Sequence, residues 1–288
     1  MAVIVGYIYP PALTIFRPYL DYMFMFTMLG IGFVLNPEDF IPIIKKPYLP
    51  LLGTLTQFLI MPLAAFCIAK ALNLPAALAL GLIVAGSVPG AMASNVISYL
   101  AKADVAFSIA ITTVSTFLAP VLTPFFTFLL ARTYMQVDFW AMFKSILLMV
   151  VIPLGVGLTL KHYFRKKIEK IQDFFPALST LFIAFICGLI VALNKDKLSH
   201  ITPFIFGAVV FLNMIGLLGG YGAGGIYGFD EKRRRTLAIE VGMQNAGLGA
   251  VLALKHFSAE AALPSALFAT WCVITASFLA GIWGQKRL

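Results

Sequence analysis

The chain has 288 residues, of which 61% are hydrophobic and only 11% are charged, and its mean hydropathy is +0.95. This composition excludes an ordinary water-soluble protein and indicates an integral membrane protein. The net charge of +9 would suit a nucleic-acid partner, but the basic residues follow a pattern that membrane topology explains by itself.

Apolar segments long enough to cross a bilayer recur along the whole chain. A membrane-spanning helix needs about 20 mainly apolar residues. Charged and Pro- or Asn-rich breaks delimit a short leading segment and nine long ones. The short segment is Met1–Tyr9, and the long ones are Leu20–Leu35, Pro47–Leu72, Pro75–Leu100, Val105–Ala131, Phe139–Leu160, Phe174–Leu193, Ile201–Phe229, Thr236–Leu254 and Ala261–Trp283. The sequence therefore predicts an all-α integral membrane protein.

The basic residues sort unequally between the two sets of loops. If Met1–Tyr9 is the end of a helix that began in the cytoplasm, fourteen basic residues fall on one side and six on the other. The fourteen are Lys45, Lys46, Lys102, Lys161, Arg165, Lys166, Lys167, Lys170, Lys232, Arg233, Arg234, Arg235, Lys286 and Arg287; the six are Arg17, Lys70, Arg132, Lys195, Lys197 and Lys255. The richer side is expected to be cytoplasmic, which also places the C-terminus in the cytoplasm. We expect no nucleic-acid partner and a location in the inner (plasma) membrane.

Two halves of the chain resemble each other. A single offset of 156 positions aligns Gln57 with Asn213, Gly86 with Gly242, Pro89 with Asn245, and Asp104 with Glu260. Each complete half would hold five helices, an odd number, so the second half enters the membrane from the opposite face. We predict an inverted repeat with residues 1–137 as its first copy and 138–288 as its second. The complete fold would have ten helices, with the first one truncated in this chain.

Two predicted spans are interrupted at equivalent positions of the repeat. One interruption covers residues 86–90 (GSVPG) and the other covers residues 242–247 (GMQNAG). Proline removes a backbone donor, and glycine adopts unusual dihedral angles at little cost, so both helices should unwind inside the membrane. Unwound backbone is tolerated there only where it lines a cavity or binds something. The alternative for either break taken alone is a simple kink.

Glu240 lies beside the second break, where an ionised carboxylate requires a proton or a cation to balance it. The basic residue predicted within a span, Lys144, lies too near a membrane surface to serve. Neutral oxygen-bearing side chains surround the breaks instead: Gln57, Ser94, Asn95, Ser108, Thr112 and Gln244. Such oxygens suit a small hard cation rather than zinc or copper. Ser108 and Thr112 share one helix face, although either hydroxyl could bond back to its own helix.

The restart of each broken helix favours the opposite charge. Free backbone N–H groups after Pro89 and Asn245 present the positive ends of helix dipoles, which attract an anion. Adjacent sites for a cation and an anion are the expected arrangement in cation-driven uptake of an organic anion. Separately, glycines recur every four residues at Gly216, Gly220, Gly224 and Gly228, a spacing that favours close helix packing over ligand binding.

At these residues the sequence resembles the bile acid:sodium symporter family. Four stretches carry the resemblance, in order and correctly spaced: TQFLIMP (Thr56–Pro62), PGAMASNV (Pro89–Val96), DVAFSIAITTVST (Asp104–Thr116) and EVGMQNAGL (Glu240–Leu248). The resemblance implies a ten-helix fold with two crossing broken helices. It also implies a core domain of helices 3–5 and 8–10 that moves against a panel domain of helices 1–2 and 6–7.

The resemblance further implies which residues bind ions and substrate. One sodium ion would be held by Ser94, Asn95, Ser108, Thr112 and Glu240, and a second by Gln57, Glu240, Gln244 and the main-chain oxygens of Val241 and Met243. Substrate contacts are implied for Ala91, Met92, Asn245 and Cys272. Met92, Cys272 and Leu212 replace polar residues of several bacterial relatives, which puts bile acid in doubt as the native substrate. A smaller anion such as pantoate or a 2-keto acid is the other expectation.

The leading hypothesis is therefore a sodium-coupled symporter that imports an organic anion by alternating access, acts as a monomer and uses no cofactor besides the coupling ions. Proton-coupled transport and metalloid efflux are alternatives on the same fold, although efflux would favour a thiol where the first break has Ser87 and Pro89. A membrane sensor that binds the anion without moving it belongs to a different class. An intramembrane enzyme is disfavoured, because no histidine lies within a predicted span.

Overall fold

The computed structural model describes residues 2–172 and 174–285, and the side chains at positions 37, 42 and 197–202 stand outside the description. Lys197, Lys286 and Arg287 of the basic-residue pattern therefore lie outside the described side chains. Among the described residues, the regular secondary structure is helical apart from one isolated backbone bridge. The helices are α1 (Ala2–Ile8), α2 (Pro11–Thr14), α3 (Leu20–Val34), α4 (Ile41–Lys45), α5 (Tyr48–Ala71), α6 (Ala76–Ser87), α7 (Ala93–Leu100), α8 (Val105–Ala131), α9 (Phe139–Ile146), α10 (Ile152–Ile168), α11 (Phe174–Leu193), α12 (Leu198–Ile226), α13 (Glu231–Gly242), α14 (Ala246–His256) and α15 (Ala259–Gln285).

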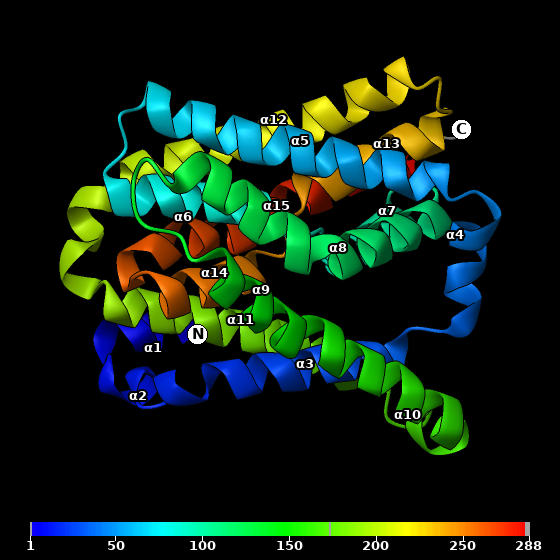
Figure 1. Ribbon diagram of the computed structural model, residues 1–288, viewed down its shortest axis with the longest axis horizontal. Helices are drawn as coiled ribbons and strands as arrows, with labels where there is room; N and C mark the ends of the chain where they lie inside the picture. The colour runs from blue at the N-terminus through cyan, green and yellow to red at the C-terminus, as the bar shows by residue number, and fades with distance from the viewer. Residues whose placement is uncertain (1, 173, 286–288) are drawn as a thin grey trace.

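The long helices run back and forth along the longest axis of the molecule (Figure 1). Among the described residues, six helical segments are long and apolar enough to cross a membrane. They are Tyr48–Ala71, Val105–Ala131, Phe139–Ile168, Pro203–Ile226, Phe174–Leu193 and Ala259–Gln285. The segment Phe139–Ile168 joins α9 and α10 through a π-helical turn at Leu147–Val151, directly before Pro153. A proline without an N–H is an ordinary cause of such an irregularity.

The other three predicted spans are shorter or interrupted. Leu20–Leu35 is realised as the 15-residue α3, and the two spans that contain the breaks are each divided into two helices. The first divided span is α6 with α7, and the second is α13 with α14. Both interruptions therefore fall where the glycine, proline and amide residues predicted them.

The helix boundaries repeat with the same offset as the sequence. Adding 156 to the bounds of α5, α6, α7 and α8 gives 204–227, 232–243, 249–256 and 261–287. The observed helices α12, α13, α14 and α15 cover 198–226, 231–242, 246–256 and 259–285. The two halves thus contain the same succession of long, broken and long helices.

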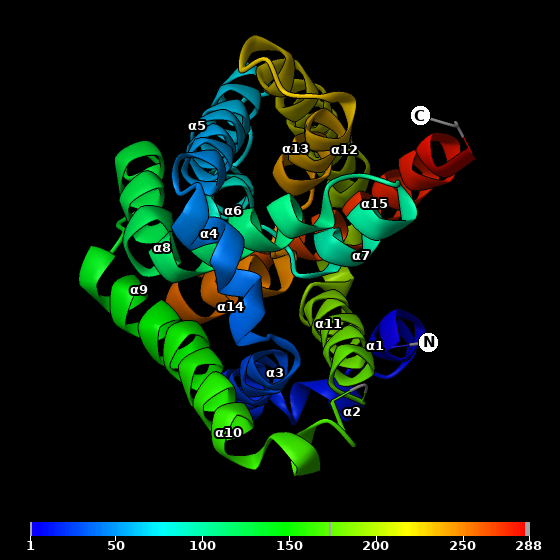
Figure 2. The same cartoon turned by 90° about the vertical axis from the view of Figure 1, so that its right-hand side faces the viewer.

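Figure 2, a view from the end of the molecule where α4 and α10 lie, shows two groups of helices. In this view α1, α3, α10 and α11 lie on the lower side, and α5, α6, α12 and α13 lie on the upper side. The connections α5–α6, α11–α12 and α14–α15 lie at the opposite end (Figure 1). Arg165–Lys167 at the end of α10 and Arg233–Arg235 at the start of α13 belong to the α4 end.

The glycine series in α12 brings this helix against α13. A Cβ atom at Gly216 would lie 2.9 Å from the Val241 carbonyl oxygen, and one at Gly220 would lie 2.4 Å from the Leu237 carbonyl oxygen. A Cβ at Gly224 would crowd the Arg234 side chain at 3.0 Å. The close-packing interpretation is confirmed for Gly216, Gly220 and Gly224, which position α12 directly beside the helix that carries Glu240. It is wrong for Gly228, which lies beyond the end of α12 at φ +69° and where an added Cβ would meet no atom within 4 Å.

Candidate functional site

The two interrupted segments meet each other in the interior. Gly90 and Gln244 form an antiparallel bridge. The Ala91 N–H donates to the Met243 carbonyl oxygen at 3.0 Å, and the Asn245 N–H donates to the Pro89 carbonyl oxygen at 2.8 Å. Each break therefore satisfies backbone groups of the other, which removes much of the cost of unwound backbone inside a membrane.

Local sequence explains where the helices stop and restart. Val88 precedes Pro89 and has the extended conformation (φ −79°, ψ 160°) that a following proline favours. In the second break, Met243 is also extended, and the Asn245 side chain accepts a hydrogen bond from the Leu248 N–H as the N-cap of α14. The amide at position 245 thus begins the second half-helix.

Glu240 is fully buried and is surrounded by hydroxyl groups from the first half of the chain. Ser94 Oγ and Ser108 Oγ both donate to Glu240 Oε1. Thr112 Oγ1 donates to Glu240 Oε2 at 2.9 Å. The Oδ1 atom of Asn95 accepts from Ser108 Oγ at 2.9 Å and from Thr112 Oγ1 at 3.4 Å. The five side chains predicted for a first cation site are therefore brought together.

The chemistry of this group is that of oxygen and negative charge. Among the interactions described for Glu240, every partner is a hydroxyl, and none is a lysine or an arginine. Thr112 Oγ1 also lies 3.0 Å from the Ser108 carbonyl oxygen, so Glu240 and its own helix are alternative acceptors for the single proton of this hydroxyl. Oxygen ligands around one carboxylate match the preference of a hard cation.

A second group lies between Glu240 and the breaks. The Nε2 atom of Gln57 donates to Gln244 Oε1 at 3.1 Å and approaches the Val88 carbonyl oxygen at 3.4 Å. The Nε2 atom of Gln244 donates to the Val241 carbonyl oxygen at 2.9 Å. Met243 contributes the carbonyl oxygen that accepts from Ala91. The structure thus gathers the predicted side chains and main-chain oxygens of the second cation site around the paired breaks.

Two features of this second group leave a place for a ligand of the carboxylate. Gln57 Oε1 is buried and has no hydrogen-bond partner in the described structure. A Cβ atom at Gly90 would lie 2.9 Å from Glu240 Oε2 and 3.6 Å from Gln57 Oε1, so only a glycine keeps the space beside these oxygens open. An unpaired buried amide oxygen next to a buried carboxylate is a fitting environment for a cation.

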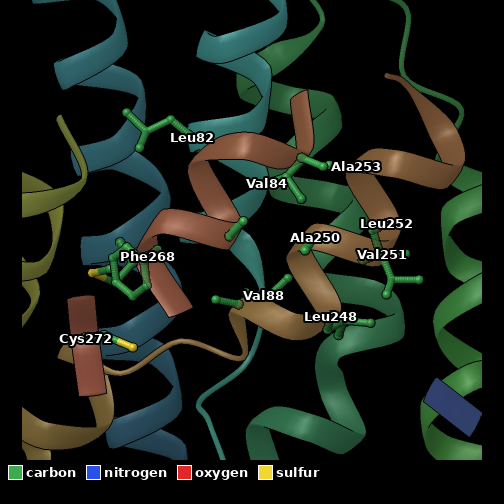
Figure 3. Close-up of a cluster of buried hydrophobic side chains, with 14 of the residues drawn as sticks. Leu82, Val84, Val88, Leu248, Ala250, Val251, Leu252, Ala253, Phe268 and Cys272 are labelled. Atoms are coloured by element: carbon green, nitrogen blue, oxygen red, sulfur yellow. The ribbon is translucent and has the colours of Figure 1, made fainter. Parts of the chain in front are cut away.

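The residues predicted to contact substrate fall into two environments. Ala91, Met92 and Asn245 are partly exposed at the paired breaks. Cys272 is buried in α15 within an apolar cluster that also includes Phe268 (Figure 3). The Sγ atom of Cys272 contacts the Ala269 carbonyl oxygen of its own helix at 3.7 Å. The breaks therefore gather three of the four predicted residues.

Two buried basic residues were not singled out by the sequence. Lys161 is 4% exposed, and its ammonium donates to the Val34 carbonyl oxygen, Asn36 Oδ1 and Gln172 Oε1 at 2.8–3.2 Å. This lysine ties the end of α10 to the end of α3. A basic cluster after a predicted span gave no signal that one of its members turns inward.

Arg235 is the second buried basic residue, with 3% exposure. Its Nε donates to Glu231 Oε1 at 2.9 Å, and its guanidinium faces the Trp283 ring. Burial raises the pKa of Glu231, but hydrogen bonds from Arg235 and Tyr221 outweigh this effect, so the pKa of Glu231 lies below its usual value. The pair anchors the start of α13, away from Glu240.

The fold and the site define a helical membrane protein with a buried oxygen cluster at two paired helix breaks. Comparison with known sequences identifies its class: the profile of the Sodium Bile acid symporter family matches residues 22–201. The Bacillus subtilis (strain 168) protein named "Uncharacterized sodium-dependent transporter YocS" is 39% identical over 98% of this chain and 88% of its own length. The chain belongs to the Sodium Bile acid symporter family.

Plant relatives are similar over the same region. The Arabidopsis thaliana "Probable sodium/metabolite cotransporter BASS1, chloroplastic" is 38% identical, over 90% of this chain and 65% of its own length. A rice protein (Oryza sativa subsp. japonica) named BASS2 in the same series is 36% identical, over 91% of this chain and 63% of its own length. The chain thus spans slightly less than two thirds of these plant proteins. The names of these relatives describe transporters and cotransporters rather than enzymes.

Proposed function

We propose that this protein is a sodium-coupled symporter that imports an organic anion by alternating access. One observation carries the proposal: a fully buried carboxylate, Glu240, is surrounded by oxygen atoms and has no basic partner among its described contacts. A buried ionised carboxylate is costly unless a cation balances it. Sodium ions are the cargo that supplies this balance, and the relatives named as sodium-dependent or sodium/metabolite transporters agree with that choice.

Two sodium ions fit the two oxygen groups. The first would be bound by Ser94, Asn95, Ser108, Thr112 and Glu240, and the second by Gln57, Glu240, Gln244 and the carbonyl oxygens of Val241 and Met243. Two sodium ions with one monovalent anion carry net positive charge inward. The membrane potential would then contribute about 2.3 kcal/mol per 100 mV for each charge.

Alternating access would occur between a core and a panel domain within a ten-helix inverted repeat. The repeating helix bounds support the repeat, with α5–α8 and α12–α15 as the core and α1, α3, α9, α10 and α11 in the panel. Polar contacts join these groups at the end opposite α4, and one of them is the donation from Asn194 Nδ2, at the end of α11, to the Ala259 carbonyl oxygen at 2.9 Å. Lys255 Nζ of α14 pairs with Asp21 Oδ2 of α3 at 2.5 Å, and His256 Nε2 lies 2.9 Å from Ser145 Oγ of α9. We assign the α4 end, which carries Arg165–Lys167 at the end of α10 and Arg233–Arg235 at the start of α13, to the cytoplasm of a plasma-membrane protein.

The substrate would bind where the α14 half-helix begins. Asn245 caps this helix, and the backbone N–H groups of its first turn favour a negative charge. Ala91 and Met92 line the same breaks with small or apolar surface. This lining supports a small carboxylate such as pantoate or a 2-keto acid more than a bile acid.

Uptake into proteoliposomes tests the proposal. A panel of small carboxylates is offered to the purified protein with an inward gradient of sodium, potassium or choline chloride at equal ionic strength. Accumulation only in sodium, increased by an inside-negative potential, is the expected result. Accumulation driven by a pH jump without sodium would indicate proton coupling instead. Saturable binding of a carboxylate without accumulation in any gradient would indicate a sensor.

A further inference from the structure

The second helix break is held by an amide that plays no part in the oxygen cluster itself. Asn213 of α12 is fully buried, and its Nδ2 donates to the Gly242 carbonyl oxygen at 2.9 Å. Gly242 is the last residue of α13, where the carbonyl groups lack helical partners. Asn213 therefore supplies the donor that the broken helix does not.

The orientation of the Asn213 amide is fixed from the other side. Thr275 Oγ1 of α15 donates to Asn213 Oδ1 at 2.8 Å. The Gly242 carbonyl oxygen can only accept, so it identifies the Nδ2 end of the amide, and this leaves Oδ1 facing the Thr275 hydroxyl, which also lies 3.1 Å from the Trp271 and Cys272 carbonyl oxygens of its own helix. The reversed amide would place two carbonyl oxygens against each other at the break. Thr275, Asn213 and Gly242 thus form a chain of hydrogen bonds across three helices.

This chain controls one peptide group beside the predicted second cation site. The Gly242 carbonyl and the Met243 N–H belong to the same planar unit. The Met243 N–H donates to the Ile239 carbonyl oxygen at 2.9 Å, so both ends of the unit are held. The Val241 and Met243 carbonyl oxygens lie on the two adjacent peptide units, and their directions depend on this one.

Helix packing brings Asn213 to this position. Gly216 lies one turn further along α12, and a Cβ there would be 2.9 Å from the Val241 carbonyl oxygen and 3.0 Å from the Gly242 Cα. The close approach of α12 lets a short asparagine side chain reach the α13 backbone. The counterpart 156 residues earlier, Gln57, is one methylene longer and reaches both the Val88 carbonyl oxygen and Gln244.

We infer that Asn213, held by Thr275, is a positioning residue for sodium binding: it aims the main-chain oxygens of the second break without touching the ion. This inference rests on the proposed sodium coupling and adds a determinant of sodium affinity outside the ligand set. Loss of the Asn213 donor frees the peptide unit between Gly242 and Met243. The sodium concentration needed for half-maximal effect then rises, while the turnover at saturating sodium changes little.

Two pairs of variants test the inference. Asn213→Leu removes the donor, and Thr275→Val removes the hydroxyl that orients it, whereas Thr275→Ser keeps that hydroxyl. Thr159→Val is the matched control, because the Thr159 hydroxyl is bonded only to the Gly155 carbonyl oxygen of its own helix. For each protein, uptake of the carboxylate that the wild type accumulates from the panel above is measured as a function of sodium concentration. The rise in melting temperature that sodium chloride produces relative to potassium chloride is measured as well.

The expected result is a roughly tenfold higher half-maximal sodium concentration for Asn213→Leu and a smaller rise of about threefold for Thr275→Val. Thr275→Ser and Thr159→Val should match the wild type. An unchanged half-maximal sodium concentration in Asn213→Leu, with or without reduced maximal uptake, would overturn the inference. Wild-type uptake that does not depend on sodium would overturn the proposed function instead. If Asn213→Leu does not fold, Thr275→Val compared with Thr275→Ser decides the question.

Discussion

The two halves of the chain place opposite chemistry at equivalent positions. Subtracting or adding 156 relates Glu240 to Val84, Ser94 to Ala250, Asn95 to Val251, Ser108 to Pro264, and Thr112 to Phe268. The first member of each pair belongs to the oxygen cluster. The second members are buried, and Val84, Ala250, Val251 and Phe268 appear together in the apolar cluster of Figure 3.

This difference shows how a repeated fold acquires a single site. The backbone breaks, the bridge between them and the packing of the flanking helices are common to both halves. The charge comes from the second half and the hydroxyl ligands come from the first, so neither half contains a site alone. The apolar positions give a stable interior, and the polar positions hold a buried carboxylate that a cation balances under the proposed function.

Replacing the charge should have the largest effect on sodium dependence. Glu240→Gln keeps the shape of the side chain but removes the negative charge that a cation balances. Loss of one partner from a buried charge interaction typically costs about 3–5 kcal/mol, so we expect the half-maximal sodium concentration to rise by at least roughly a hundredfold. Sodium titration of uptake measures this change. Glu169→Gln, at an exposed surface pair with Arg165, is the control and should behave as wild type.

Making the first break resemble the second should have the next largest effect. Position 90 is glycine, whereas the equivalent position 246 is alanine. In Gly90→Ala the new Cβ would lie 2.9 Å from Glu240 Oε2 and displace the carboxylate from the space beside Gln57. Overpacking of about 1–3 kcal/mol predicts a roughly tenfold loss of sodium affinity.

The control for this variant is Gly155→Ala, where an added Cβ would meet no other atom within 4 Å. Sodium-dependent thermal stabilisation distinguishes the two alanine variants without any need for the substrate. Equal sodium responses in both would show that the space at Gly90 plays no part in cation binding.

Removal of one hydroxyl should have a moderate effect. Thr112→Val replaces an oxygen ligand by a methyl group and makes the position apolar, as Phe268 is in the other half. Loss of one hydrogen bond to a charged group costs roughly 1.5–3 kcal/mol, part of which the Ser94 and Ser108 hydroxyls offset. We expect a severalfold to tenfold rise in the half-maximal sodium concentration, measured by uptake. A response equal to that of Thr180→Val, whose hydroxyl bonds its own helix, would contradict the assigned ligand role.

The smallest effect on sodium affinity is expected for a substitution at the buried apolar positions that are equivalent to the oxygen cluster. Val84→Thr is nearly isosteric and introduces one hydroxyl among buried apolar residues at the position equivalent to Glu240. An unpaired buried hydroxyl costs about 1–3 kcal/mol of stability, so the melting temperature should fall while the half-maximal sodium concentration stays constant. A change in sodium affinity larger than that of Thr112→Val would contradict the distinction between the oxygen cluster and the equivalent apolar positions.

Much of this arrangement could be predicted from local sequence. Glycine, proline and amide residues identified both breaks, and the four-residue spacing of Ser108 and Thr112 placed them on one helix face toward Glu240. Ser94 and Asn95 were identified as oxygen-bearing residues just beyond the first break, and the family resemblance grouped them with Ser108, Thr112 and Glu240 into one proposed cation site. Local chemistry was sufficient for Ser94, Asn95 and Glu240 because they lie within two turns of a recognisable interruption, whereas Ser108 and Thr112 lie on the unbroken helix α8.

Other features depend on contacts that a single segment does not reveal. Phe139–Leu160 was predicted as a span, yet the helical segment continues to Ile168 through a kink at Phe164. Beyond the predicted end, Lys161 donates to the Val34 carbonyl oxygen and to the Asn36 and Gln172 side chains. Arg235 turns inward to Glu231 and Trp283 although its neighbours mark a basic surface. The repeat aligned Asn213 with Gln57, but its contact with Gly242 depends on how closely α12 packs on α13.

Direct binding of radioactive sodium to the purified protein tests the central claim most simply, since it requires no knowledge of the substrate. The account predicts saturable binding to the wild type that potassium and choline do not displace, and no saturable binding to Glu240→Gln. Binding of equal affinity and amount in the two proteins would contradict it.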